Sequence, residues 1–169
     1  MNQLQNVFLI GPMGAGKSAV GRQLAQALHM TFFDSDDEIE ARTGVDIPFI
    51  FEKEGEAGFR KREAKAIDDL SGKEGIVLAT GGGAIMDAQS RSYLGARGFV
   101  VYLYTSVEQQ VRRTLRGRER PMLANGDSRE ILEQLMNVRD PLYREIADMV
   151  VATDGRKVKA VADEILEKM

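Results

Sequence analysis

The sequence predicts an α/β fold in which a parallel sheet is covered by helices on both faces. Five short apolar runs are typical of buried strands, and segments with apolar residues at helical spacing separate them. Strands that alternate with helices favour a parallel arrangement, because each connection has to cross over the sheet. We therefore expect one three-layer α/β/α domain over residues 1–169, built on a five-stranded sheet.

The expected strands and helices follow one another along the whole chain. The strands span residues 6–10, 31–34, 76–80, 99–104 and 149–152. The helical faces comprise Val20, Leu24, Ala27 and Leu28; Ile131, Leu135, Met136 and Val138; and Val158, Val161, Ile165 and Leu166. Ligands of such sheets bind at the carboxyl ends of the strands, so functional residues should follow each strand.

Composition and charge argue against several classes of function. The formal net charge of −3 gives no reason to expect a nucleic-acid partner. The chain has no cysteine and one histidine, His29, which argues against disulfides, thiolate or histidine-rich metal sites and a Ser-His-Asp triad. No stretch approaches the ~20 apolar residues of a membrane span, and the N-terminal apolar run is too short for a signal peptide. We expect a soluble, cytoplasmic monomer that binds neither membrane nor nucleic acid.

The segment after the first expected strand carries a phosphate-binding pattern. Gly11, Gly16, Lys17 and Ser18 fit G-x-x-x-x-G-K-[ST]. In this pattern, backbone N–H groups and a helix N-terminus face phosphate oxygens. Lys17 would reach the β- and γ-phosphates of a nucleoside triphosphate, and the Ser18 hydroxyl would ligate Mg²⁺. The residues expected to contact the nucleotide here are Gly14, Ala15, Gly16, Lys17, Ser18 and Ala19.

Two acidic residues lie at the end of the second expected strand. Asp34 and Asp36 are two apart, so on an extended strand their side chains point the same way. Asp34 is a candidate to orient Mg²⁺ or its waters, and Asp36 is a candidate to accept a proton from a hydroxyl or to hydrogen-bond to it. The alternative is a solvated first turn whose acids are favoured by the helix dipole, which we prefer for Asp37 and Glu38.

Spacing alone does not decide the roles of two further segments. Arg60 and Glu63 are neighbours at i, i+3 on an expected helix, where they form either a weak surface ion pair or a rigid fork for an anionic ligand. The three glycines 81–83 fit either a close approach of backbone to a ligand, with free N–H groups, or a flexible loop. These candidates for a second substrate site argue against a pure ATPase. The absence of a guanine-reading N-K-x-D element argues against a GTPase switch.

An arginine-rich segment follows the fourth expected strand. Five arginines lie within residues 112–120 of an acidic chain, and no aromatic residue is interleaved with them. A solvated basic face or a nucleic-acid patch is one interpretation. Beside a phosphate-binding loop we prefer a mobile lid over about residues 116–126, which closes over ATP and stabilises the transferred phosphoryl group.

Seven motifs occur in a specific order, namely GPMGAGKS, GRQLA, FFDSDDEIE, TGVDIPFIFEKEGEAGFRKRE, ATGGGAI, RERPML and RDPLYREIAD. With these motifs the sequence resembles the shikimate kinases, a family of nucleoside-monophosphate-kinase-like P-loop enzymes, over nearly the whole chain. Only the first motif is specific by itself, whereas the joint order and spacing are highly specific. The resemblance implies ATP-dependent phosphorylation of the 3-hydroxyl of shikimate, a step toward chorismate and the aromatic amino acids.

The resemblance also implies roles for residues around the acceptor. Arg60 and Arg139 pair with the shikimate carboxylate, while Glu63 holds the two arginines. Asp36 contacts the reacting hydroxyl and is the candidate general base, with simple orientation as the alternative. The substrate-binding insertion covers about residues 35–70. The other expected substrate contacts are the backbone of Gly81 and Gly82 and the rings of Phe51 and Phe59.

On the donor side, the resemblance implies that Ser18 ligates Mg²⁺ and that Asp34 supports the ion through water. Lys17 and the lid residue Arg120 act on the transferring phosphate. The residues expected to flank adenine are Arg113 and the turn around Arg156. Ala19 departs from the threonine that is frequent in the family, which would remove one hydroxyl contact to the α-phosphate.

Two alternatives remain from the residues alone. One is a related small-molecule kinase of the same fold, such as a gluconate or nucleotide kinase, although the set of carboxylates, arginines and glycines favours a carboxylated polyol. The other is a module that binds ATP without transferring its phosphate.

Overall fold

The structure, a computed structural model, describes residues 5–114 and 128–169 and contains a five-stranded parallel sheet in the order β2-β3-β1-β4-β5. The strands are β1 (Val7–Ile10), β2 (Thr31–Asp34), β3 (Ile76–Ala79), β4 (Phe99–Tyr104) and β5 (Met149–Ala152). The predicted α/β fold with a five-stranded parallel sheet is therefore confirmed. Each strand lies within one residue of its predicted bounds at either end.

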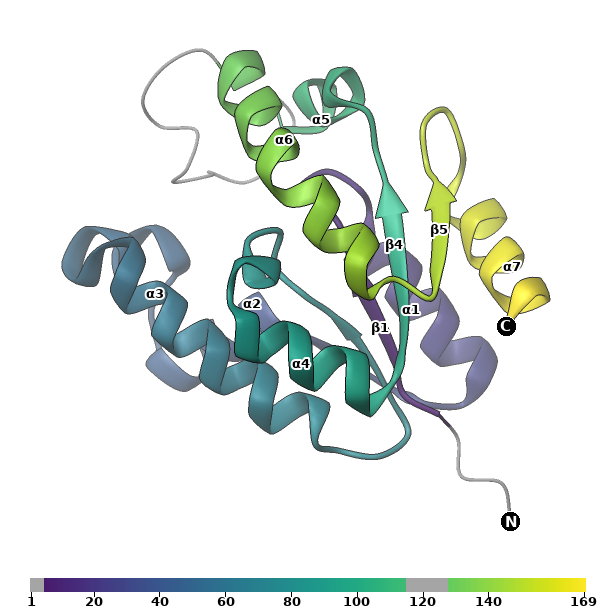
Figure 1. The fold of residues 1–169 in the computed structure, drawn as a ribbon. Coiled ribbons are helices and arrows are strands. Elements are labelled where there is room, and N and C mark those ends of the chain that lie inside the picture. Colours follow the sequence, from purple (N-terminus) through teal and green to yellow (C-terminus); the bar gives the residue numbers. More distant parts are fainter. Residues whose placement is uncertain (1–4, 115–127) are drawn as a thin grey trace.

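Helices cover both faces of this sheet (Figure 1). They are α1 (Lys17–Leu28), α2 (Ser35–Thr43), α3 (Ile47–Ser71), α4 (Ala88–Arg97), α5 (Val107–Thr114), α6 (Ser128–Ile146) and α7 (Val158–Lys168), with a short 3₁₀ turn η1 (Ala84–Met86). None of the described helices is long and apolar enough to cross a membrane.

Alternation along the central strand β1 divides the interior into two cores. Val7 and Leu9 pack with residues of α1 and α7 on one face. Phe8 and Ile10 pack with residues of α3, α4 and α6 on the other. All four side chains are buried, as expected for a strand of a parallel sheet covered on both faces. The three-layer arrangement thus follows from the continuous apolar run that forms β1.

The pair α2 and α3 forms a smaller apolar cluster of its own. Its buried members are Ile39, Ile50, Phe59 and Ala66. Within α3 the backbone kinks at Gly55, whose φ of 72° and ψ of −179° are not helical. Across this kink Glu54 accepts two hydrogen bonds from Arg62, at 2.7 and 2.8 Å. The kink divides α3 into an outer arm and a longer arm that packs against the sheet.

The strand order places three functional loops side by side. Strand β1 lies between β3 and β4, and β2 is the outer neighbour of β3. The segments after β1, β2 and β3 therefore meet at the carboxyl edge of the sheet, where ligands of such folds bind.

Candidate active site

The loop between β1 and α1 wraps tightly around the sheet edge. A Cβ built on Gly11 would lie 2.6 Å from the Leu103 carbonyl oxygen of the neighbouring strand, so a side chain has no room there. Gly16 precedes α1 with a φ of 85°, in the left-handed region that glycine adopts without strain. The N–H groups at the start of α1 are therefore presented to the space beyond the sheet, as an anion site requires.

The Lys17 ammonium lies over this loop. Its Nζ donates hydrogen bonds to the carbonyl oxygens of Gly11 at 2.6 Å and of Pro12 at 2.8 Å. The backbone N–H of Ala15 donates to the Pro12 carbonyl at 3.3 Å, so it is used inside the loop. The lysine thus brings a positive charge to the phosphate-binding loop.

A hydroxyl and a carboxylate meet where α1 and β2 come together. The Ser18 hydroxyl donates a hydrogen bond to Oδ2 of Asp34. The other oxygen of Asp34 caps α2, because it accepts from the backbone N–H groups of Asp36 at 2.9 Å and Asp37 at 3.1 Å. Mg²⁺ prefers such oxygen ligands and usually takes only one or two from the protein. The donor set of Ser18 and Asp34 therefore fits this ion.

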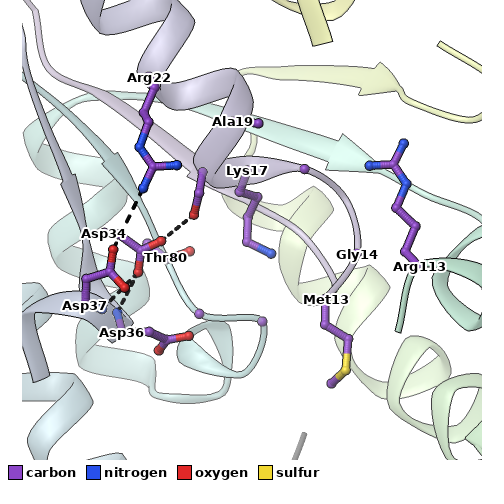
Figure 2. A pocket seen from close by; sticks show the side chains of 14 residues that line it. Met13, Gly14, Lys17, Ala19, Arg22, Asp34, Asp36, Asp37, Thr80 and Arg113 are labelled. Carbon is purple, nitrogen blue, oxygen red and sulfur yellow. Dashed lines mark hydrogen bonds and ion pairs between the residues drawn. The ribbon is translucent and has the colours of Figure 1, made fainter. Parts of the chain in front are cut away.

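These loops enclose a cavity of about 400 Å³ at the carboxyl edge of the sheet. Figure 2 shows Lys17 and the aspartates Asp34 and Asp36 around this space, with Arg113 across the loop from them. Its lining comprises Met13, Gly14, Gly16, Lys17, Ser18, Ala19, Arg22, Asp34, Asp36, Asp37, Thr80, Gly81, Gly82 and Arg113. Most of the predicted nucleotide and metal residues are thereby brought together with Asp36.

Four lining residues were not singled out by the sequence as site residues: Met13, Arg22, Asp37 and Thr80. Arg22 and Ser18 are four residues apart on α1, so helical spacing alone places them on one face. Nη2 of Arg22 lies 4.0 Å from a carboxylate oxygen of Asp37. The expected solvated first turn of α2 therefore borders the cavity at Asp37.

A second, buried cluster of charge lies beside the cavity. Nη1 of Arg60 donates to Oε1 of Glu63 at 2.9 Å, and the Glu63 side chain is only 4% exposed. Arg139 of α6 is 5% exposed. Burial raises the pKa of Glu63, against the opposing charges of Arg60 and Arg139, and burial lowers the pKa of Arg139. The Arg60–Glu63 contact is therefore not a surface ion pair.

The burial of Arg139 in this cluster favours an anionic ligand. Arg60 pairs with Glu63 and also lies 3.4 Å from a carboxylate oxygen of Glu56, whereas Arg139 is desolvated by burial. Within the described part of the chain, Oε2 of Glu63 has no hydrogen-bond partner. Buried charges are costly unless they are paired, so the buried guanidinium of Arg139 is suited to receive a carboxylate.

The glycine loop after β3 joins the cavity to this cluster. A Cβ built on Gly81 would lie 2.8 Å from Oε2 of Glu63 and 3.0 Å from Oδ1 of Asp36. One on Gly83 would lie 2.4 Å from Nη2 of Arg60. The expectation of free N–H groups is wrong at Gly81, whose N–H donates to the Ser35 hydroxyl at 3.0 Å. These glycines are needed because charged side chains crowd the loop.

Several expected contacts lie elsewhere. Phe51 and Phe59 pack on each other, with ring centroids 4.9 Å apart, and belong to the cluster of α2 and α3. Neither ring lines the 400 Å³ cavity, because Phe59 is only 4% exposed and faces the interior of the insertion. That these rings line the shikimate cavity stays a prediction.

The two arginines expected near adenine differ in position. Arg113 lines the cavity, and its Nη1 would lie 3.4 Å from a Cβ built on Gly16. Arg156 instead donates to the Ala152 carbonyl at 2.9 Å and pairs with Glu164 at 2.8 Å. It holds the turn between β5 and α7 and does not line the cavity. Arg120 and the expected lid at 116–126 lie outside the described residues.

Comparisons with known proteins agree with this geometry. The family model described as shikimate kinase matches residues 13–169. A curated shikimate kinase of Shewanella oneidensis is 57% identical over 169 residues, which cover 100% of this chain and 99% of the relative.

Solved structures give the same result. A shikimate kinase from Acinetobacter baumannii in complex with shikimate is 50% identical with a TM-score of 0.95, covering 98% of this chain and 92% of that one. A shikimate kinase from Aquifex aeolicus is 35% identical with a TM-score of 0.82, covering 96% and 94%. A gluconokinase from Sinorhizobium meliloti is 17% identical with a TM-score of 0.60, covering 99% and 92%, and shares the fold alone.

Proposed function

The chain belongs to the shikimate kinase family, and we propose that the cavity and charge cluster at the carboxyl edge of its sheet carry out that family's reaction. The enzyme transfers the γ-phosphoryl group of ATP to the 3-hydroxyl of shikimate and releases shikimate 3-phosphate and ADP. The alternative of a gluconate or nucleotide kinase has only distant structural likeness, which speaks for the fold and not for the substrate.

On the donor side, the loop before α1 binds the phosphates of ATP. Its backbone N–H groups and the Lys17 ammonium face the β- and γ-phosphates, and Arg113 flanks the nucleotide. Ser18 and Asp34 would hold Mg²⁺, the latter through water. When bound, the ion neutralises charge on the β- and γ-oxygens. Arg120 would approach the transferring group from the lid, which makes it the third catalytic residue beside Lys17 and Asp36.

On the acceptor side, Arg60 and Arg139 clamp the carboxylate of shikimate, and Glu63 orients the Arg60 guanidinium. The ring then rests against Gly81 and Gly82. The binding energy of this contact positions the substrate, because the carboxylate itself does not react.

In this proposal Asp36 acts on the reacting hydroxyl. The hydroxyl oxygen forms a new bond to the γ-phosphorus while the bond from that phosphorus to the β–γ bridging oxygen breaks, and its electron pair leaves with ADP. The proton of the hydroxyl passes to Asp36 as general base, or Asp36 orients the hydroxyl while the proton leaves later.

One observation carries this assignment: a single glycine loop separates the phosphate-binding cavity from two arginines, of which Arg139 is buried. A module that only senses ATP has no need of a second, buried anion site. A coupled assay for ADP, run with and without shikimate, tests the proposal. ADP release that requires shikimate supports it, whereas ADP release that is equal with gluconate or without any acceptor contradicts it.

We further propose that residues 1–169 act as one P-loop kinase domain, with a substrate-binding insertion at about 35–70 and a lid at about 116–126. The enzyme would work as a cytoplasmic monomer without a nucleic-acid partner. Size-exclusion chromatography with light scattering checks the monomer.

A further inference from the structure

A buried tyrosine of α6 contacts the glycine loop of the proposed site. Tyr143 is 1% exposed, and its hydroxyl donates a hydrogen bond of 2.5 Å to the carbonyl oxygen of Gly82. The two residues are 61 positions apart in the chain. Buried hydroxyls normally find a partner. Here the partner is informative, because Gly82 lines the cavity.

The surroundings of Gly82 link this contact to both halves of the site. A Cβ built on Gly82 would lie 3.3 Å from the Met13 backbone nitrogen of the phosphate-binding loop. It would lie 3.7 Å from Nη1 of Arg139. Arg139 and Tyr143 are four residues apart on α6, so both side chains leave the same face of the helix. A guanidinium and a hydroxyl of one helix thus approach the same peptide.

The ring of Tyr143 is itself held in place. It packs on the ring of Tyr102 with centroids 4.8 Å apart and an interplanar angle of 32°. The Tyr102 hydroxyl in turn donates to Oδ1 of Asp140 at 2.6 Å. Burial raises the pKa of Tyr143, so its hydroxyl keeps the proton that it donates. The packing of the two rings, which needs neither hydroxyl, therefore fixes the position from which Tyr143 donates to Gly82.

We propose that Tyr143 is a positioning residue for shikimate, which acts by fixing the carbonyl of Gly82 and the glycine loop against the bound ring. This proposal rests on the acceptor site proposed above. Without the hydroxyl, the partly buried Gly82 carbonyl loses this donor and the loop is free to shift relative to Arg139. The effect should fall mainly on shikimate, because the ATP phosphates are held by the N–H groups and the lysine of the loop before α1.

The substitution Tyr143→Phe tests this role, because it removes one oxygen and keeps the ring. We expect KM for shikimate to rise about 5- to 10-fold, the loss typical of one neutral hydrogen bond, while KM for ATP stays within about 2-fold. Tyr102→Phe is the matched control: it removes the hydroxyl of an equally buried ring that contacts Asp140 instead. It should lower the melting temperature about as much and leave both KM values unchanged.

Three results distinguish the possibilities. A Tyr143→Phe enzyme with a lower melting temperature but a normal KM for shikimate overturns the proposal, since the hydroxyl would then serve stability alone. An equal rise of KM in both Phe variants also overturns it, because the cause would be a general loosening of α6. Arg139→Ala in the same assay tests the carboxylate clamp separately. If that variant binds shikimate normally while Tyr143→Phe does not, the clamp fails and the role of Tyr143 stands.

Discussion

Replacing Arg139 by alanine separates shikimate binding from phosphoryl transfer. Arg139 is 5% exposed and lies in the cluster with Arg60 and Glu63, so water screens its charge little. Truncation of one partner in a buried, hydrogen-bonded charge pair costs about 2–5 kcal/mol. Because Arg60 remains to hold the carboxylate, we expect the lower end, about 2–3 kcal/mol. This corresponds to a KM for shikimate raised about 30- to 150-fold.

The same substitution should affect turnover less. The carboxylate does not react, but its fixation brings the hydroxyl to the γ-phosphate, so kcat should fall about 10-fold. KM for ATP should stay within about 2-fold. Arg139→Lys should recover only part of the loss, because a point charge does not reproduce a planar fork. The measurement is a steady-state ADP assay in which each substrate is varied at saturation of the other.

An analogue of shikimate without the carboxylate supplies the decisive comparison. The wild-type enzyme should lose affinity for the analogue, whereas Arg139→Ala should be nearly indifferent to the missing group. Arg144→Ala on the same helix is the control, because its guanidinium is 51% exposed and pairs with Asp140 away from the cluster. If Arg139→Ala discriminates between acid and analogue as strongly as the wild type does, the carboxylate is bound elsewhere.

Three further predictions concern the acceptor site and its supports. Asp36→Asn should lower kcat at least about 10²-fold, as loss of a general base does, with little change in ATP affinity by calorimetry; lost ATP affinity with kcat intact would place Asp36 in the nucleotide site. Burial raises the pKa of Glu63 above its ordinary 4.5, so its ionisation costs stability as pH rises from about that value through the raised pKa. The free energy of unfolding of Glu63→Gln, measured by denaturant titration, should therefore rise relative to that of the wild type over this pH interval. A difference between the two free energies that stays constant with pH would exclude the raised pKa. Gly55→Ala should destabilise by about 1–3 kcal/mol, because φ of 72° with ψ of −179° is essentially restricted to glycine. Gly95→Ala, the same change in open space within α4, should instead stabilise by about 0.5–1 kcal/mol, and equal effects at both positions would refute the strain at the kink.

The sequence predicts well whatever depends on spacing along the chain. The apolar runs mark the strands, and the glycines before Lys17 mark the phosphate-binding loop with its position at the sheet edge. For Asp34, spacing along the chain does not predict the direction of the side chain. From the sequence we expect Asp34 and Asp36 on one extended strand, with side chains that point the same way. In the structure Asp34 caps α2, and Asp36 lies in the first turn of that helix. Both residues nevertheless line the cavity, because β2 ends beside it.

What the sequence does not predict depends on contacts between distant segments. The i, i+3 spacing of Arg60 and Glu63 does not reveal that Glu63 is buried, because its burial results from packing of α3 against the loop after β3. The kink at Gly55 changes the direction of α3, and Phe59 faces the small cluster of the insertion. The hydrogen bond from Tyr143 to Gly82 spans 61 residues and leaves no local signal.

The crowding around the glycine loop explains how donor and acceptor stay in register. A methyl group at Gly81 would collide with the carboxylates of both Asp36 and Glu63, and one at Gly82 would press on the loop that binds phosphate. Gly81, Gly82 and Gly83 together therefore border the candidate base, the proposed carboxylate clamp and the phosphate-binding loop. Because β1 and β3 are hydrogen-bonded neighbours, the two loops that follow them begin side by side at one edge of the sheet. In the proposed reaction, the sheet would set the distance between the γ-phosphate and the hydroxyl, and the side chains around the glycines would set the orientation.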